Sequence, residues 1–285
     1  MPPARLPLPL ALLLAAMIAC PGCGPRGPAN PSFDLGVADA RHALDDMAGQ
    51  PRPLARPLVL LAGWADPGIV VRGLRRRLEC VIDDDRIIHV SFTGTGSFDD
   101  ARHRLLQAVD DAFPSDDPGH TRPVDVVAIS MGGLVARYAA AEHHADARRL
   151  RIVRLITLAT PHQGARLARL PALDGLQRDM RPGSAFLDAL PARHDVDYDI
   201  HAYVRLDDAV VGAVRAGPDA ETPAFWIANR YFDFAHILAY RDPRLVAEIA
   251  RHLRNEPTWA RHPPTPVPHP FREGRTQPPL HEDAR

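Results

Sequence analysis

The sequence predicts an α/β fold in which a mostly parallel sheet is covered by helices on both faces. Residues 57–62 are a continuous apolar run, which is typical of a strand buried on both faces, and residues 124–129 read as a further buried strand. Such runs alternate along the chain with segments of helical periodicity, for example residues 98–112. Between two Pro-rich ends lie about 200 residues, enough for one well-buried domain.

The elements follow one another in a strand–helix order. Strands are expected at 57–62, 86–91, 124–129, 151–158, 199–205 and 223–228, and helices at 69–79, 98–112, 132–143 and 242–254. Asp242 and Pro243 open the last helix with a capping residue and a proline at the first helical position. Residues 163–198 lack a clear strand, so we expect a small lid-like insertion over the C-terminal edge of the sheet, where ligands usually bind.

Composition excludes several classes of protein. The formal net charge is −1 and aromatic residues make up 6%, which argues against a dedicated nucleic-acid binder. The sequence contains no Lys, so a Lys base or Schiff-base chemistry is excluded. Three cysteines are too few for a disulfide scaffold or a four-cysteine zinc site. No dinucleotide, phosphate-loop or metalloprotease motif occurs, and we predict no cofactor and no metal.

Both ends of the chain are expected to lie outside the domain. Residues 1–20 are predicted to be an export signal, and Met17-Ile-Ala-Cys20 resembles a bacterial lipobox, which implies lipidation of Cys20. The alternative is a plain secretory signal that is cleaved nearby. Residues 21–55 then form a flexible tether and N-terminal extension, residues 56–255 the domain, and residues 256–285 a disordered Pro-rich tail. The protein is thus expected to be exported, facing the periplasm or the cell exterior.

Ser130 lies where the third predicted strand runs directly into a helix. Such a turn needs small residues two before and two after the serine, and these are Ala128 and Gly132. Gly133 gives the helix more room to approach the sheet. The turn raises the hydroxyl above the sheet edge and places the backbone N–H of Met131 at a helix N-terminus, where it can stabilise negative charge.

Residues 124–138 resemble the nucleophile elbow of α/β-hydrolases, in the bacterial lipase and esterase branch with its HSMGG-type turn. The usual first Gly is Ala128 here, and the usual His before the serine is Ile129. A second segment, Thr160-Pro-His-Gln-Gly164, resembles the TPHxG sequence of the same lipases, and the resemblance covers about residues 57–254. It implies the α/β-hydrolase fold and a Ser-His-Asp triad.

In this fold the chain order is serine, then acid, then histidine. Asp207 and Asp208 both follow the fifth strand, and the lipase-like pattern Asp-x-Val-Val favours Asp208, with Asp207 as the alternative acid. His236 falls in the loop before the last helix, where the order requires the base. The resemblance also implies Trp64 as the second oxyanion donor beside Met131, although its indole is equally suited to packing against a lid. His162 precedes the acid, so we expect it to shape the pocket.

These residues predict a serine hydrolase that cleaves carboxylic esters through an acyl-enzyme, as lipases and carboxylesterases do. The expected substrate is a small-molecule or lipid ester, and the membrane is reached through the lipid anchor. The same triad would also serve an acyltransferase, a thioesterase or a glycolipid deacylase. A non-catalytic, surface-anchored binding domain is the remaining alternative.

Overall fold

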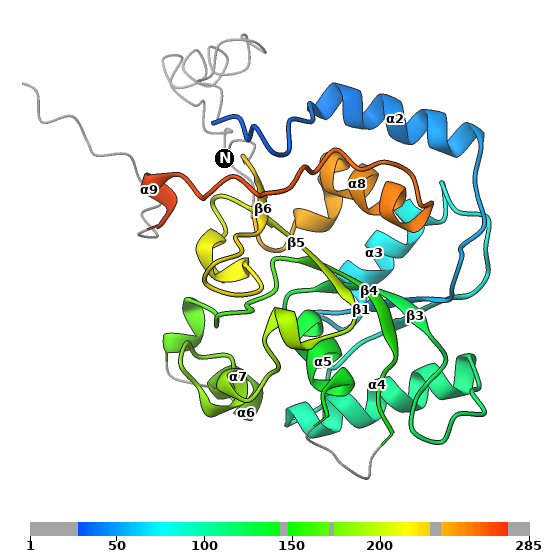
Figure 1. Cartoon of the computed structure of the whole chain (residues 1–285), viewed down its shortest axis with the longest axis vertical. Helices are drawn as coiled ribbons and strands as arrows, with labels where there is room; N and C mark the ends of the chain where they lie inside the picture. Colours follow the sequence, from blue (N-terminus) through cyan, green and yellow to red (C-terminus); the bar gives the residue numbers. More distant parts are fainter. Residues whose placement is uncertain (1–27, 143–147, 171–173, 229–234, 273–285) are drawn as a thin grey trace, which may run out of the picture.

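A six-stranded parallel sheet forms the centre of the molecule (Figure 1). The structure is a computed structural model that describes residues 28–142, 148–170, 174–228 and 235–272. The strands are β1 (Leu58–Leu61), β2 (Ile87–Val90), β3 (Val124–Ile129), β4 (Ile152–Leu158), β5 (Asp199–Arg205) and β6 (Phe225–Ile227). Their order is β2-β1-β3-β4-β5-β6, and every neighbouring pair is parallel. The predicted α/β-hydrolase architecture is confirmed.

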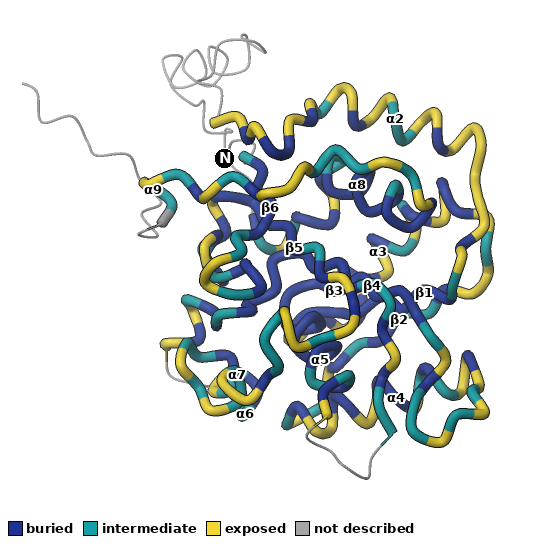
Figure 2. Tube along the Cα trace, viewed as in Figure 1, coloured by how far each residue is buried: buried dark blue, intermediate teal, exposed yellow. Residues whose placement is uncertain are grey.

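Helices cover both faces of this sheet. On one face lie α2 (Val37–Gly49), α3 (Ile69–Leu78) and α8 (Pro243–Leu253), and on the other lie α4 (Phe98–Ala112) and α5 (Met131–Ala140). The alternation of side chains along a strand divides the core, because Leu58 and Leu60 pack with the first group and Val59 and Leu61 with the second. Every position of β1 and β3 is therefore buried (Figure 2), which explains the unbroken apolar sequence of β1. The one charged residue of β3, Asp125, pairs with Arg56 at 3.0 Å.

Short helical pieces occupy the connections. They are η1 (Leu167–Arg169), α6 (Gly175–Asp179), α7 (Ala185–Asp188), η2 (Arg193–Asp195), η3 (Ala213–Ala216), η4 (Ala239–Arg241) and α9 (His269–Arg272). The first four lie in the predicted insertion at residues 163–198, which contains no strand among its described residues. No helix in the described ranges combines the length and apolar character that crossing a membrane requires.

The predicted domain limits of 56 and 255 are too narrow. Upstream, α2 packs on α8. Downstream, the prediction of a disordered tail is wrong for residues 256–272: the indole N–H of Trp226 donates to the carbonyl of Thr265 at 2.8 Å, and Val267 is buried. Asn30 donates to the Trp226 carbonyl at 2.7 Å, so both terminal segments cover the β6 edge. The signal prediction for residues 1–20, including Cys20, and residues 273–285 lie outside the described residues.

The Pro-rich composition of residues 256–272 suggested disorder. These residues are nevertheless ordered, because they form hydrogen bonds with residues in other parts of the fold. The carboxylate of Glu248, fully buried on α8, accepts the backbone N–H groups of Trp259 and Ala260 at 2.9 and 3.0 Å. The hydroxyl of Tyr203 donates to the same carboxylate at 3.1 Å. Such partners supply the donors and acceptors that an extended proline-containing segment cannot find within itself.

Two histidines beside this carboxylate are held neutral. The hydroxyl of Tyr203 lies 2.8 Å from Nε2 of His252, and the rings of His201 and His252 are 4.2 Å apart. Burial, followed by nearby positive charges, lowers the pKa of His252 to about 2, and burial lowers the pKa of His201 to about 4. Each folded-state value is below the ordinary 6.5, so the folded protein binds these protons less readily than the unfolded chain does.

This difference predicts acid sensitivity. The contribution of both histidines to the free energy of unfolding is complete above pH 6.5 and is lost as the pH falls toward 4, by up to about 1.4 kcal/mol per pH unit for each. In the variant His252→Gln, urea unfolding between about pH 7 and pH 4 should show a shallower dependence than in the parent. The exposed control His194→Gln should keep the parent slope. If the free energy of unfolding of His252→Gln depended on pH in the same way as that of the parent, the lowered pKa of His252 would be contradicted.

Candidate active site

Ser130 stands at the turn between β3 and α5 with backbone angles of φ 52° and ψ −124°. A non-glycine residue rarely adopts a positive φ, and such a conformation persists only where the surroundings enforce it. Here the N–H of Ser130 donates to the carbonyl of Leu158 at 2.8 Å, and the hydroxyl of Thr160 donates to the Ser130 carbonyl at 2.8 Å. Both backbone groups of the turn are therefore held by β4 and the segment that follows it.

Small residues make room for this turn. A Cβ atom on Gly132 would lie 2.7 Å from the carbonyl oxygen of Ala62, and one on Gly133 would collide with the hydroxyl of Thr160. Ala128, in place of the usual glycine, is fully buried and fits. The close approach of the first turn of α5 to the end of β1 thus depends on Gly132, and its approach to the segment after β4 depends on Gly133.

His236 reaches the serine from the segment that follows β6. Its Nε2 lies 3.0 Å from Oγ of Ser130, and its Nδ1 lies 2.8 Å from Oδ2 of Asp208. Because the carboxylate accepts, Nδ1 carries the proton and Nε2 is left to accept one from the serine hydroxyl. The imidazole side chain is only 14% exposed.

Asp208, rather than its neighbour Asp207, contacts the histidine. Its carboxylate is completely buried, and the second oxygen, Oδ1, accepts the N–H groups of Val210 and Val211 at 3.0 and 2.9 Å. Asp207 is exposed, and partial burial of its carboxyl raises its pKa. The structure therefore brings Ser130, His236 and Asp208 together from three separate strand ends.

The two expected oxyanion donors lie beside the serine. Met131 is the first residue of α5, and a Cβ atom on Gly63, next to Trp64, would lie 3.2 Å from the Ser130 Cβ. In the described part of the chain, no acceptor pairs with the backbone N–H of Met131 or of Trp64. Within that part of the chain, both N–H groups are therefore without an internal acceptor.

Four contacts around the serine and the segment after β4 were not predicted from the sequence. The Trp64 indole donates to Oδ2 of Asp174 at 2.8 Å and so ties the β1 loop to the start of α6. Arg137 donates to Nδ1 of His162 at 3.1 Å, and Nε2 of His162 lies 3.1 Å from the Thr157 hydroxyl. Burial, together with the charge of Arg137, lowers the pKa of His162 well below its usual range. The TPHxG resemblance pointed to this segment but not to the contact between Thr160 and Ser130.

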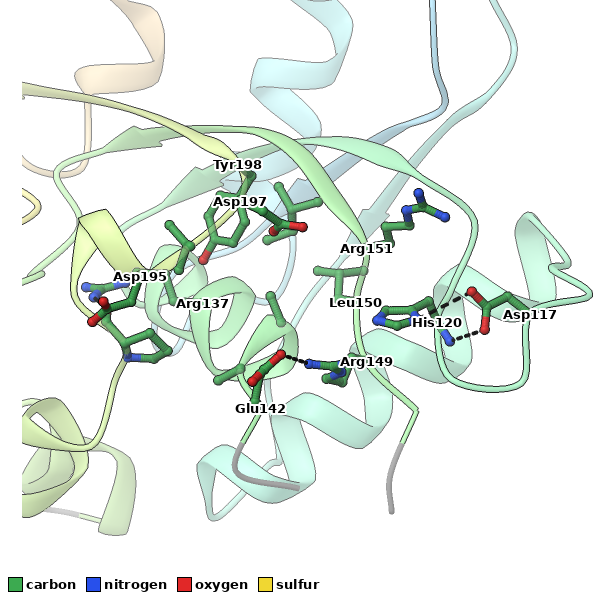
Figure 3. A pocket seen from close by; sticks show the side chains of 15 residues that line it. Asp117, His120, Arg137, Glu142, Arg149, Leu150, Arg151, Asp195, Asp197 and Tyr198 are labelled. Atoms are coloured by element: carbon green, nitrogen blue, oxygen red, sulfur yellow. Dashed lines mark hydrogen bonds and ion pairs between the residues drawn. The ribbon is translucent and has the colours of Figure 1, made fainter. Parts of the chain in front are cut away.

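A cavity of about 440 Å³ lies at the edge of the sheet where the strands begin, opposite Ser130 (Figure 3). Its walls include Arg151, just before β4, and Tyr198, just before β5. Acidic and basic side chains there pair with each other: Arg149 with Glu142 at 2.8 Å and His120 with Asp117 at 3.3 Å. Its walls contain no nucleophile with a base. Among the described residues there is also no group of three His, Cys, Asp or Glu side chains that could hold a metal ion.

Residues 72–174 match a family model described as "Putative serine esterase (DUF676)". The matched region contains Ser130 but ends before Asp208 and His236. Among curated proteins, no relative matches the sequence. The matched description and the elbow agree on a serine hydrolase of esters as the general class.

Several solved structures are similar in fold. The lin2722 gene product of Listeria innocua aligns with a TM-score of 0.49 and 14% identity, over 71% of this chain and 95% of that one. A lipase-esterase related protein of Clostridium acetobutylicum has a TM-score of 0.43 and 11% identity, over 72% and 96% of the two chains. The mature form of the lipase BlEst2 of Bacillus licheniformis has a TM-score of 0.36 and 21% identity, over 55% and 69%.

Proposed function

We propose that this protein is a serine hydrolase that cleaves carboxylic esters of the kind used by lipases and carboxylesterases. The proposal depends chiefly on one observation, the hydrogen-bonded row from Ser130 through His236 to Asp208. A serine hydroxyl is a poor nucleophile unless a base accepts its proton, and the base needs an acceptor on its other nitrogen to keep the correct tautomer. Both requirements are met within hydrogen-bonding distance.

In the proposed reaction, Oγ of Ser130 attacks the ester carbonyl while Nε2 of His236 takes the hydroxyl proton. The negative charge that develops on the carbonyl oxygen is bound by the N–H groups of Met131 and Trp64. His236 then gives its proton to the leaving alkoxide as the C–O bond breaks, and the acyl group stays on Ser130. Water repeats the sequence on the acyl-enzyme and releases the acid. Asp208 stabilises the imidazolium at each stage without taking its proton.

The contacts among Ser130, His236 and Asp208 also bear on the alternative functions. An acyltransferase or thioesterase would use the same residues with another acceptor or leaving group, and no described contact favours either. A non-catalytic binding domain would require a member of the triad to be missing, whereas all three are in contact.

Export and lipidation of Cys20 form a second part of the proposal. They are supported by the apolar run that precedes Ala19-Cys20. An acyl group at this position would tether the domain to a membrane that faces the periplasm or the cell exterior.

A fluorophosphonate probe should label Ser130, because the probe reports a serine whose hydroxyl is activated by a base. The variant Ser130→Ala should not be labelled and should lose about 10⁶-fold in kcat on p-nitrophenyl esters. A series of esters from short to long acyl chains in the parent would separate esterase from lipase preference. Unchanged turnover in Ser130→Ala would refute the proposal.

The two adjacent aspartates offer a matched pair of variants. Asp208→Asn should lower kcat by about 10⁴-fold, because the amide cannot stabilise the imidazolium and favours the wrong tautomer. Asp207→Asn should stay close to the parent, since its carboxyl does not contact His236 in the described structure. Initial rates with one soluble ester give kcat for both variants. A large loss in Asp207→Asn with little loss in Asp208→Asn would assign the acid to Asp207.

Metabolic labelling with a fatty acid tests the anchor. The full chain expressed in a bacterium should incorporate the label and fractionate with membranes, whereas Cys20→Ser should not incorporate it. Cys80→Ser serves as the control because Cys80 lies within the folded domain, two residues after the end of α3, and this variant should keep the label. Equal incorporation by parent and Cys20→Ser would exclude lipidation at this position.

A further inference from the structure

The exposed large apolar side chains of the described residues have one feature of topology in common. Each follows the C-terminal end of a strand: β1, β4, β5 or β6. We call them the apolar rim, and they are Trp64, Ile69, Leu167, Leu170, Val214 and Ile237. Since all strands are parallel, these segments leave the sheet at the same edge as Ser130.

Hydrogen bonds connect the rim to the triad. Ile237 follows His236 directly. The N–H of Leu167 donates to the carbonyl of Val210 at 3.0 Å, and the N–H of Val210 in turn donates to Asp208 at 3.0 Å. Leu167 on η1 is therefore held against the loop that carries the acid. Isolated exposed apolar residues are ordinary, but a set confined to the edge that carries one site marks an interaction surface.

Two arginines lie among the rim residues of the β4 and β5 loops. Arg169 is the residue before Leu170, and Arg215 is the residue after Val214. The guanidinium of Arg215 donates to the carbonyl of Gln163 at 3.2 Å, and the N–H of Gln163 donates to the carbonyl of Arg215 at 3.1 Å. These two hydrogen bonds join the loops that follow β4 and β5. Burial lowers the pKa of Arg215, and the positive charge of Arg169 lowers it further, so the two guanidinium groups repel each other.

Exposed carboxylates such as Asp207 also follow these strands, but none of those described pairs with the two arginines. Within the described ranges neither Arg169 nor Arg215 forms a salt bridge. Asp174, an acid at the same edge, is already bonded to Trp64 and to the N–H of Gln177. At the opposite edge Arg149 is paired with Glu142, whereas the exposed Arg122 and Arg151 form no salt bridge in the described ranges. The two edges therefore differ chiefly in the exposed large apolar side chains, which among the described residues belong to the first edge.

We propose that the apolar rim, together with Arg169 and Arg215, is a surface that seats on an anionic phospholipid surface. Apolar side chains gain free energy when they leave water for the acyl region, and arginines near an anionic membrane gain from the lipid charge. A lipid with acyl chains and a negative headgroup satisfies both parts of the surface. This inference extends the proposed ester hydrolysis by naming the class of substrate, an ester of an anionic lipid, that the site would take from such a surface.

Vesicle cosedimentation tests the surface. The full chain carries Ser130→Ala and Cys20→Ser in every arm, so that neither turnover nor an acyl anchor contributes. Its binding to phosphatidylcholine vesicles is compared with binding to vesicles that also contain phosphatidylglycerol. We expect preferential binding to the anionic vesicles, weakened by added salt because the interaction is partly electrostatic.

Two double variants separate the charge from the apolar contribution. Arg169→Gln with Arg215→Gln should lower partitioning to anionic vesicles about thirtyfold, since each arginine near such a surface contributes about fivefold. Leu167→Ser with Leu170→Ser should lower it about tenfold or more. The control is Arg122→Gln with Arg151→Gln, which removes two exposed arginines at the opposite edge and should bind as the parent does. Urea unfolding of each variant verifies that it is folded.

Equal binding to neutral and anionic vesicles, no binding to either, or parent-like binding by both rim variants would overturn the proposal. A loss in the Arg122 and Arg151 control equal to that in the Arg169 and Arg215 variant would also overturn it, because net charge alone would then explain the effect. Binding is measured without turnover. A failure to bind anionic vesicles is therefore distinct from a failure to hydrolyse esters, because the assays with soluble esters measure hydrolysis separately.

Discussion

The strained backbone of Ser130 is the feature on which the rest of the site depends. A positive φ at a residue with a side chain costs free energy, so the turn exists only because bonds from Leu158 and Thr160 and the absence of side chains at two glycines enforce it. The parallel sheet supplies those constraints, because β4 runs beside β3 in the same direction and ends beside it. The hydroxyl is thereby placed at the sheet edge where the loops with Asp208 and His236 also emerge.

The buried carboxylate of Asp208 is the second requirement. An ionised group without water is costly unless its oxygens are bonded, and here one oxygen takes two backbone N–H groups while the other takes His236. The carboxylate is therefore fixed in place before any substrate arrives. The same two backbone groups belong to Val210 and Val211, whose carbonyls receive the N–H groups of the β4 loop. Ordering the acid and ordering the rim of the site are thus parts of one network.

The edges of the sheet serve different purposes. The β6 edge is closed by segments from both ends of the chain, which meet at Trp226. At the edge where the strands begin, charges of both signs neutralise each other around a cavity. The segments that leave the sheet where the strands end carry Ser130, His236 and Asp208 as well as the exposed large apolar side chains of the described residues. The proposed lipid contact would therefore lie on the same edge as the serine hydroxyl.

Local sequence patterns were sufficient for the helix at Phe98–Ala112, the strand at Asp199–Arg205 and the elbow at Ser130, because periodicity and turn chemistry act between neighbouring residues. The expected order of serine, acid and histidine along the chain was sufficient to select His236, which contacts Ser130. It could not separate Asp207 from Asp208, since adjacent residues differ only in which way the loop turns them. Nor could it find the bond between Trp64 and Asp174 or the packing of residues 256–272, because these depend on partners distant in sequence that only the folded chain brings together.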